Sequence, residues 1–260
     1  MVHSNLVKNC KILQNIVLPS YLQSINYNAF SNCVSLNSLI MPDTVVSIGS
    51  YAFSGCKSLN MIHLSDNLIS IDEAAFSGCV SLTEVNLPDS LTSVGESAFS
   101  GISISEISFP YKLKKIHDYA FGNNSKLKTV VINSEKLTSA IRTISNCPNL
   151  KQVVVLSNAD VSSALWGINN SVNIYGLINS HAYEFATSYN HNFYKINSPV
   201  NLKVTNKGND SVTLSWDSVN YVEGYKVYRS NSASTGFEQI ASVQENTYTD
   251  IGLDNNQDYY

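Results

Sequence analysis

The residues of this chain most able to do chemistry are its five cysteines. Thiols can pair as disulfides, bind a soft metal ion or act as nucleophiles. Four of them recur at a constant step of 23 residues: Cys10, Cys33, Cys56 and Cys79. Neither a Cys-x-x-Cys spacing nor a closely spaced histidine pair accompanies them, which argues against zinc. We expect buried free thiols, because cysteine is among the most frequently buried residue types.

Disulfides between successive repeats are the alternative. If the repeats stack as strands do, equivalent cysteines lie about 4.8 Å apart, which disulfide geometry allows. A row of equivalent positions, however, gives no reason for two members to pair while others stay free.

The other reactive residues favour a surface role over catalysis. Asp72 and Glu73 are adjacent acids, which we interpret as solvated surface charge. The segment 95–99 begins like a Gly-x-Ser-x-Gly nucleophile motif but ends in phenylalanine, and no phosphate-binding glycine loop occurs. We therefore predict no catalytic residue, no metal site and no cofactor, and expect that the chain is not an enzyme. Surface or capping roles are expected for the histidines His63, His117, His181 and His191.

The cysteines belong to a repeat that also places phenylalanine once in each unit. A fixed period of this length is typical of a solenoid, in which each unit buries its apolar face against its neighbours. We expect the phenylalanine side chains to stack along the interior. The dipeptide returns every 23 residues and, after one deletion, after 22: Ala29-Phe30, Ala52-Phe53, Ala75-Phe76, Ala98-Phe99 and Ala120-Phe121.

Each unit holds two short strand-like segments joined by a turn, as in residues 82–87 and 91–94. Apolar and polar residues alternate in both segments, as in half-buried strands. Proline after most of the first segments has no N–H and ends ladder pairing there. The stretch before each cysteine, such as 95–101, is short, and we expect it to form one tight helical turn.

Alternation along the first segments predicts which side chains point outward. These side chains are mixed in character, so the strip is either a partner-binding face or a solvated sheet whose residues were selected for strand propensity. The outward pairs are Asn15/Val17, Ser38/Ile40, Met61/His63, Glu84/Asn86, Glu106/Ser108, Thr129/Val131 and Gln152/Val154. We take eight central positions as the candidate binding site: Ser38, Ile40, Met61, His63, Glu84, Asn86, Glu106 and Ser108.

The repeat resembles that of BspA-like leucine-rich repeat proteins of bacterial and protist surfaces. Residues 46–59 closely match the family pattern, with Ile48-Gly49, Ala52-Phe53 and Cys56 in the expected places, and the motif covers roughly residues 6–155. Toward the C-terminus Ile102 and Asn124 replace the cysteine. The resemblance implies adhesion or protein binding, with matrix proteins, mucosal glycoproteins or other cells as partners.

Residues 173–196 are predicted to cap the solenoid, as such arrays commonly end. A last strand is expected at 173–176, and Ser180 can N-cap a short helix. Phe193 and Ile196 are expected to return to the stack. One apolar helical face carries residues at i, i+3, i+4 and i+7: Ala182, Phe185, Ala186 and Tyr189.

Beyond residue 196 the rhythm changes, and the chain resembles a fibronectin type III domain. Segments 200–204, 212–216 and 224–229 alternate as sandwich strands do. About 60 of an expected ~100 residues are present, so we expect the domain to be incomplete within these residues. The matching residues are Pro199, Trp216, Tyr225, Val227, Tyr228, the segment 249–253 and the corner tyrosine Tyr259.

The composition narrows the class of protein further. The net charge is −4 and no cluster of Lys or Arg stands out, so nucleic-acid binding is not expected. No apolar stretch is long enough for membrane insertion, and residues 1–4 do not begin a signal peptide. Because the repeats begin in mid-unit, we expect residue 1 to lie inside a longer protein. The low charged content of 14% suits an extracellular or cell-surface location, with signal and anchor outside this segment.

The sequence thus predicts a mainly β protein with two domains. Residues 1–196 form a leucine-rich-repeat solenoid with repeats of about 23 residues and a C-terminal cap. Residues 197–260 form a partial fibronectin type III β-sandwich. The expected function is non-catalytic adhesion to an unidentified protein or glycoprotein partner on host or neighbouring cells. The alternative is a structural spacer or accessory region of a larger extracellular enzyme.

Overall fold

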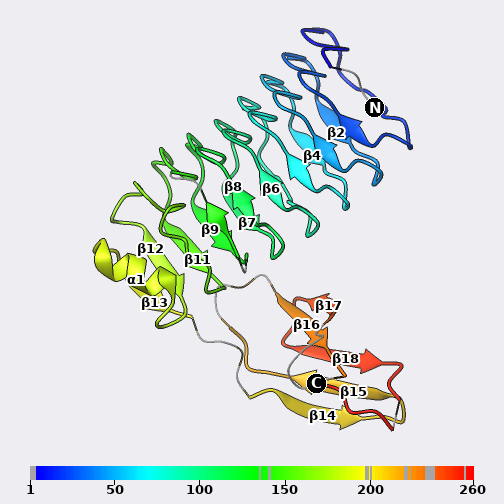
Figure 1. The fold of residues 1–260 in the computed structure, drawn as a ribbon, viewed down its shortest axis with the longest axis vertical. Coiled ribbons are helices and arrows are strands. Elements are labelled where there is room, and N and C mark those ends of the chain that lie inside the picture. The colour runs from blue at the N-terminus through cyan, green and yellow to red at the C-terminus, as the bar shows by residue number, and fades with distance from the viewer. Residues whose placement is uncertain are drawn as a thin grey trace. The chain divides into compact units, whose positions relative to one another are not determined.

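The computed structural model describes residues 4–134, 136–139, 142–196, 199, 201–219, 222, 224–231, 238–254 and 256–260. The chain divides into two compact units, Met1–Lys195 and Ile196–Tyr260. Figure 1 shows the first unit as a row of stacked coils that ends in a short helix. The first unit is therefore a β-solenoid, as the repeat predicted.

The second strand of each repeat joins a continuous parallel sheet in the first unit. Its strands follow chain order, and the register advances by one repeat each time, with Ser47 paired to Ser70 and Ser70 to Ser93. This order is what stacking of equivalent segments requires. The strands are β1 (Ser24–Ile25), β3 (Ser47–Ile48), β5 (Ser70–Ile71), β6 (Ser93–Val94), β8 (Lys115–Ile116) and β10 (Thr138–Ser139).

The first strands form a second parallel ladder, which is interrupted. β2 (Ser38–Ile40) pairs with β4 (Met61–His63). A separate sheet then holds β7 (Glu106–Phe109), β9 (Thr129–Ile132), β11 (Gln152–Val155), β12 (Asn173–Gly176) and β13 (Phe193–Lys195).

The strand expected at residues 82–87 does not form. In this fully described stretch, no backbone hydrogen bond joins Thr83–Leu87 to β4 or to β7. Val85 is nevertheless buried between the exposed Glu84 and Asn86. Alternation depends only on the path of the chain, whereas strand pairing also requires the neighbouring backbones to lie within hydrogen-bonding distance.

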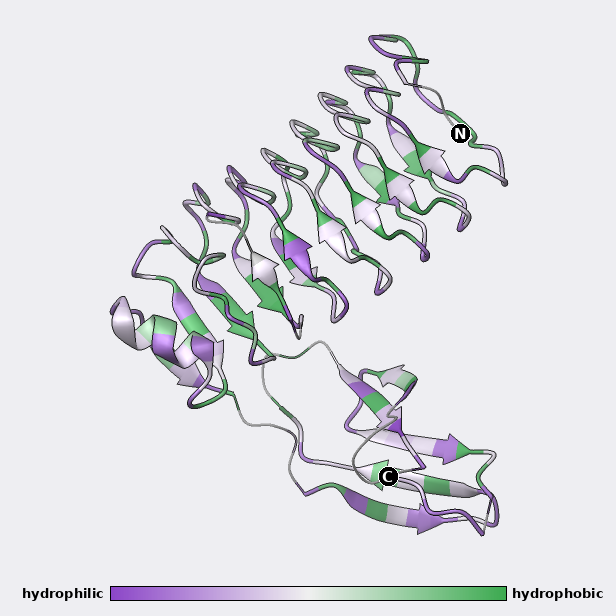
Figure 2. Ribbon diagram, viewed as in Figure 1, coloured by the Kyte–Doolittle hydropathy of each residue, from purple (hydrophilic) through white to green (hydrophobic). Residues whose placement is uncertain are grey.

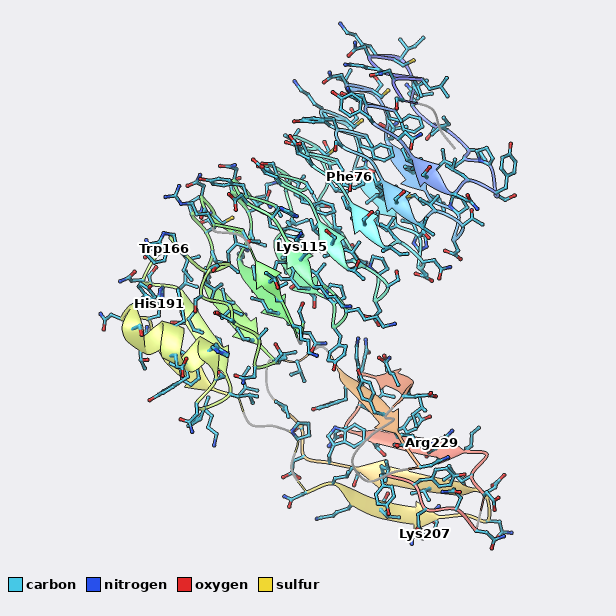
Figure 3. All side chains as sticks on the ribbon, in the orientation of Figure 1. Phe76, Lys115, Trp166, His191, Lys207 and Arg229 are labelled. Carbon is cyan, nitrogen blue, oxygen red and sulfur yellow. The ribbon has the colours of Figure 1, made fainter. Side chains whose placement is uncertain are left out.

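The phenylalanines stack along the interior, as predicted. Phe30, Phe53, Phe76, Phe99 and Phe121 are fully buried, and successive ring centroids lie 5.1–5.2 Å apart with interplanar angles of 4–10°. Figure 3 labels Phe76 within this stack. A fully buried phenylalanine contributes on the order of 2 to 3 kcal/mol, so the row is a main source of cohesion between turns.

All five cysteines are free, and Cys33, Cys56 and Cys79 are buried, as predicted. The thiol of Cys56 donates to the backbone oxygen of Phe30 at 3.1 Å, and that of Cys79 donates to Phe53 at 3.2 Å. Asn124, which occupies the cysteine position two turns after Cys79, donates in the same way to the oxygen of Phe99 at 3.1 Å. Asparagine can thus supply the same hydrogen bond as cysteine here, whereas the buried Ile102 in the intervening turn fills the position without a donor.

We expect the native thiols of Cys56 and Cys79 to react only slowly with an alkylating reagent near pH 8. Burial raises the pKa of Cys56 from 9.0 to about 12 and that of Cys79 well above 9.0, so the reactive thiolate is scarce. Because the folded-state pKa is raised, the stability linked to Cys56 is present below pH 9 and is lost as the pH rises through 12. Mass spectrometry after native and denaturing labelling without reductant measures this. Fast native labelling, or thiols still blocked in denaturant, would contradict it.

The stretch before each cysteine is a series of turns, so the predicted helical turn is wrong. The residue before each buried alanine has a positive φ, which is 59° at Tyr51, 49° at Ala74 and 53° at Ser97. A second left-handed residue precedes the cysteine, as at Gly78 with φ 72°. A right-handed helix cannot continue through left-handed residues, which explains the difference.

The cap contains the predicted helix, α1 (His181–Ser188). The Ser180 hydroxyl accepts a hydrogen bond from the Tyr183 N–H at 3.3 Å, which is the expected N-cap. Ala182, Phe185 and Ala186 are buried, whereas Tyr189 ends the helix and remains 43% exposed. Strand β13 then pairs with β12 beside the helix (Figure 1), so the predicted return to the stack adds one more strand.

The second unit contains two antiparallel sheets. One has the order β14 (Lys203–Lys207), β15 (Ser211–Ser215) and β18 (Thr247–Ile251), and the other pairs β16 (Tyr225–Arg229) with β17 (Glu238–Val243). The first strand begins at Lys203. Val200, where the sequence placed its start, lies outside the described residues together with Asn197 and Ser198. Beyond β16, Ser230 and Tyr260 exchange two backbone hydrogen bonds of 2.9 Å.

Candidate binding face

The outward side chains of the first-strand segments form a strip along the solenoid, which we call the first-strand face. The register places Ser38 beside Met61 and Ile40 beside His63. All eight predicted site residues lie on this strip. Ser38 and Ser108 are half-buried, and the other six are exposed: Ile40, Met61, His63, Glu84, Asn86 and Glu106.

The N-terminal part of the face is apolar. Val17 is 94% exposed, Ile40 is 65% exposed and Met61 is 53% exposed, and the three residues come from consecutive turns. Single exposed apolar residues are common on protein surfaces, but a run of them on adjacent turns is a feature of interaction sites. This part of the face therefore presents three exposed apolar side chains on adjacent turns.

The middle of the face is acidic. Glu84 and Glu106 are exposed, and the Asn86 side-chain amide donates to the Glu84 carboxylate at 3.0 Å. Among the described residues, the structure records one ion pair, Arg229–Asp250 in the second unit. Neither Glu84 nor Glu106 is therefore paired with a Lys or Arg side chain there, and both can meet positive charge on a partner.

The side chains in the C-terminal part of the face are less exposed to solvent than the sequence predicted. Gln152 donates from its side-chain amide to the Thr129 hydroxyl at 3.2 Å. Val154, predicted to point to solvent, is only 1% exposed. In the register Val154 lies between Val131 and Tyr175, so bulky neighbours flank it on both sides. Figure 2 shows the corresponding hydrophobic colour along β9 and β11.

Two exposed lysines beside this face were missed in the sequence, where no basic cluster stood out. Lys128 and Lys151 immediately precede β9 and β11, and both are exposed. The backbone N–H of Lys128 donates to Ser105 at 2.7 Å, and that of Lys151 donates to Lys128 at 2.9 Å. The lysines therefore stand on successive turns. Their spacing of 23 residues, the length of the repeat, was the signal that could have identified them.

The remaining reactive side chains have structural partners. Glu73 accepts a hydrogen bond from the Tyr51 hydroxyl, and partial burial raises the pKa of Asp72. His181 contacts the backbone oxygen of Asn158 through Nδ1 at 2.9 Å, and the buried His191 stacks on Phe185. Figure 3 labels His191 beside the cap helix.

Metal ligands and membrane-spanning helices were also sought among the described residues. Within the described ranges, no group of three or more His, Cys, Asp or Glu side chains is arranged to hold a metal ion. No helix in the part of the chain that the structure describes is long and apolar enough to cross a membrane.

A family model described as the BspA type leucine rich repeat region matches six copies, over residues 1–72 and 55–166. No curated protein matches the chain. The T. pallidum leucine rich repeat protein has a TM-score of 0.51 and 24% identity over 69% of this chain and 84% of its own. A Bacteroides ovatus leucine-rich repeat protein has a TM-score of 0.38 and 22% identity over 64% of this chain.

A leucine rich cell surface protein from Faecalibacterium prausnitzii has a TM-score of 0.39 and 18% identity, over 75% of this chain and 69% of its own. The chain spans 57% of the Bacteroides ovatus protein. The family model matches the sequence, and the similarity to the T. pallidum protein shows that the fold of stacked coils is shared as well.

Proposed function

This chain belongs to the BspA-type leucine-rich repeat family, and from that premise we propose that its first-strand face binds a protein or glycoprotein partner. The observation that carries the proposal is the run of exposed apolar side chains at Val17, Ile40 and Met61, next to the carboxylates Glu84 and Glu106. Aliphatic and charged side chains that lie close together on a rigid scaffold suit protein recognition.

The location we propose is extracellular or at the cell surface. A charged content of 14%, with polarity supplied largely by neutral side chains, supports it. The role at that location is adhesion, in which a rigid sheet presents its side chains to a neighbouring cell or matrix without catalysis.

The second unit supports a display role. Its sheets, β14-β15-β18 and β16-β17, suit an incomplete fibronectin type III sandwich. The Tyr259 hydroxyl accepts a hydrogen bond from the Asp254 N–H at 3.1 Å, as the corner tyrosine of such sandwiches does with a nearby backbone group. Trp216 is buried and packs edge-on against Tyr225 at 5.2 Å. We propose that this unit is a spacer module for the solenoid.

The double variant Ile40→Lys/Met61→Asp tests the proposal. Both side chains are exposed, so fold and stability should be unchanged, whereas the anchor of the face is lost. Central interface side chains often contribute 2 kcal/mol or more, so binding should weaken about 30-fold or more. Surface plasmon resonance against matrix proteins and mucins, with circular dichroism of the variant, measures both effects.

The matched control places the same charges on the opposite strands, as Ser70→Asp/Ser93→Lys. These serines are half-buried partners in the second-strand sheet. If the control weakens binding while the Ile40/Met61 variant binds normally, the wrong face has been chosen. Failure of the native chain to bind any such ligand would favour the structural spacer in a larger extracellular enzyme.

A further inference from the structure

Opposite charges occupy separate stretches of the solenoid. Residues 58–111 contain seven acidic residues and no Lys or Arg, whereas residues 112–151 contain eight Lys or Arg and only two acids. All fifteen side chains of the two dominant types are exposed. The acids are Asp66, Asp72, Glu73, Glu84, Asp89, Glu96 and Glu106, and the bases are Lys112, Lys114, Lys115, Lys126, Lys128, Lys136, Arg142 and Lys151.

The boundary between the charges crosses the first-strand face between the turns of Glu106 and Lys128. On one side of it lie Glu106 and Glu84, followed by the apolar Met61 and Ile40. On the other side lie Lys128 and Lys151, followed by Tyr175 and Tyr194, whose rings stack at 4.9 Å. Tyr194 is 45% exposed. Read along the solenoid, the face is apolar, acidic, basic and aromatic, in that order.

We propose that the partner of this face is a second copy of the chain, bound in antiparallel orientation. This inference rests on the proposed function, because it names the partner of the same face. A two-fold axis between the turns of Glu106 and Lys128 makes the face complementary to itself. In such an isologous pair every contact occurs twice.

Because the turns are evenly spaced, a turn on one side of the two-fold axis faces the turn of the second copy that lies equally far on the other side. Glu106 faces Lys128 of the second copy, and Glu84 faces its Lys151. Two turns further out Ile40 faces Tyr194, so the charged centre is flanked by apolar contact at both ends. From Ser38 to Tyr194 the strip spans eight turns and about 34 Å, which is long enough for an interface of roughly 800 Å² per copy.

The orientation is decided by charge. In a parallel pair Glu84 and Glu106 would face their own counterparts, and like charges opposite each other are unfavourable. A partner carrying only positive charge would match the acidic half and be repelled by Lys128 and Lys151. An antiparallel second copy satisfies both halves with residues that are already present.

Two charge-reversal variants test the pair. Glu84→Lys/Glu106→Lys makes all four central positions basic, and Lys128→Glu/Lys151→Glu makes them all acidic. We expect the native chain to dimerise at about 50 mM salt and to dissociate roughly tenfold more readily at about 500 mM. Each variant alone should be monomeric, and an equimolar mixture of the two should form a heterodimer. Sedimentation velocity ultracentrifugation measures the oligomeric state of the native chain at both salt concentrations, of each variant and of the mixture.

A matched control and a charge swap complete the test. Asp66→Lys/Glu96→Lys changes the net charge by the same amount off the face and should dimerise as the native chain does. The quadruple swap, with both reversals in one chain, should restore the homodimer. A monomeric native chain, a mixture that stays monomeric, or a reversal variant that still dimerises would overturn the proposal.

The outcome can be separated from that of the proposed function. If the native chain is monomeric but loses matrix binding on Ile40→Lys/Met61→Asp, the face binds a foreign partner and only this inference fails. If the chain dimerises through the face but binds no matrix or mucin ligand, this inference holds, and the proposal that the face binds a matrix or cell-surface partner fails.

Discussion

Replacing Phe76 with alanine is expected to lower the free energy of unfolding by about 3 to 5 kcal/mol. Its ring stacks on Phe53 at 5.2 Å on one side and on Phe99 at 5.1 Å on the other, so rigid neighbours enclose the site from both directions. The cavity cannot collapse without shifting whole turns. Urea denaturation followed by circular dichroism measures the loss.

The matched variant is Phe30→Ala near the N-terminal end of the stack. Phe30 is also fully buried, but its aromatic partner is Phe53 on one side, and the equivalent position one turn earlier is the half-buried Val7. The smaller and looser neighbour lets the site relax, so the cost should be smaller by about 1 to 2 kcal/mol. Equal shifts of the denaturation midpoint would mean that stacking between rings does not decide stability.

The second large effect is expected for Gly95→Ala, with a loss of about 3 kcal/mol. A Cβ at this position would lie 2.5 Å from the backbone carbon of Asp72 and 2.5 Å from the backbone nitrogen of Glu73. Gly95 also donates its N–H to Ile71 at 2.7 Å, so the two turns cannot separate without losing that bond. The glycine is therefore required by the close approach of adjacent turns.

Gly78→Asn is the control for this variant. Gly78 has φ +72° with open space where a Cβ would stand. Asparagine already occupies the equivalent left-handed position at Asn32 and Asn123, with φ of 57° and 59°. We expect a change within about 0.5 kcal/mol, because asparagine tolerates this conformation. If Gly95→Ala proves as stable as the control in thermal unfolding, the turns are not packed as closely as the structure indicates.

The parts of the fold that repeat were predictable from the sequence. The 23-residue period determined the stacked coils, the interior row from Phe30 to Phe121, and the buried thiols of Cys33, Cys56 and Cys79. The cap helix was predictable from Ser180 and the apolar spacing that follows it. Each of these features depends on residues within one unit, and the repeat then presents the same environment in every turn.

The candidate face was only partly predictable. Alternation correctly placed Ile40, Met61 and Glu84 at the surface, because it requires only the direction of each side chain. It failed at Val154, where exposure depends on the size of the neighbours that the register brings alongside.

The sequence by itself thus determined what the turns have in common: their repeat length and their buried side chains. Tertiary structure alone decided what differs between turns. It broke the strand ladder at Thr83–Leu87. It also brought Lys128 and Lys151 onto successive turns beside the face that carries Glu84 and Glu106. These features arise from contacts between neighbouring turns, and such contacts depend on the distance between backbones, which no single repeat specifies.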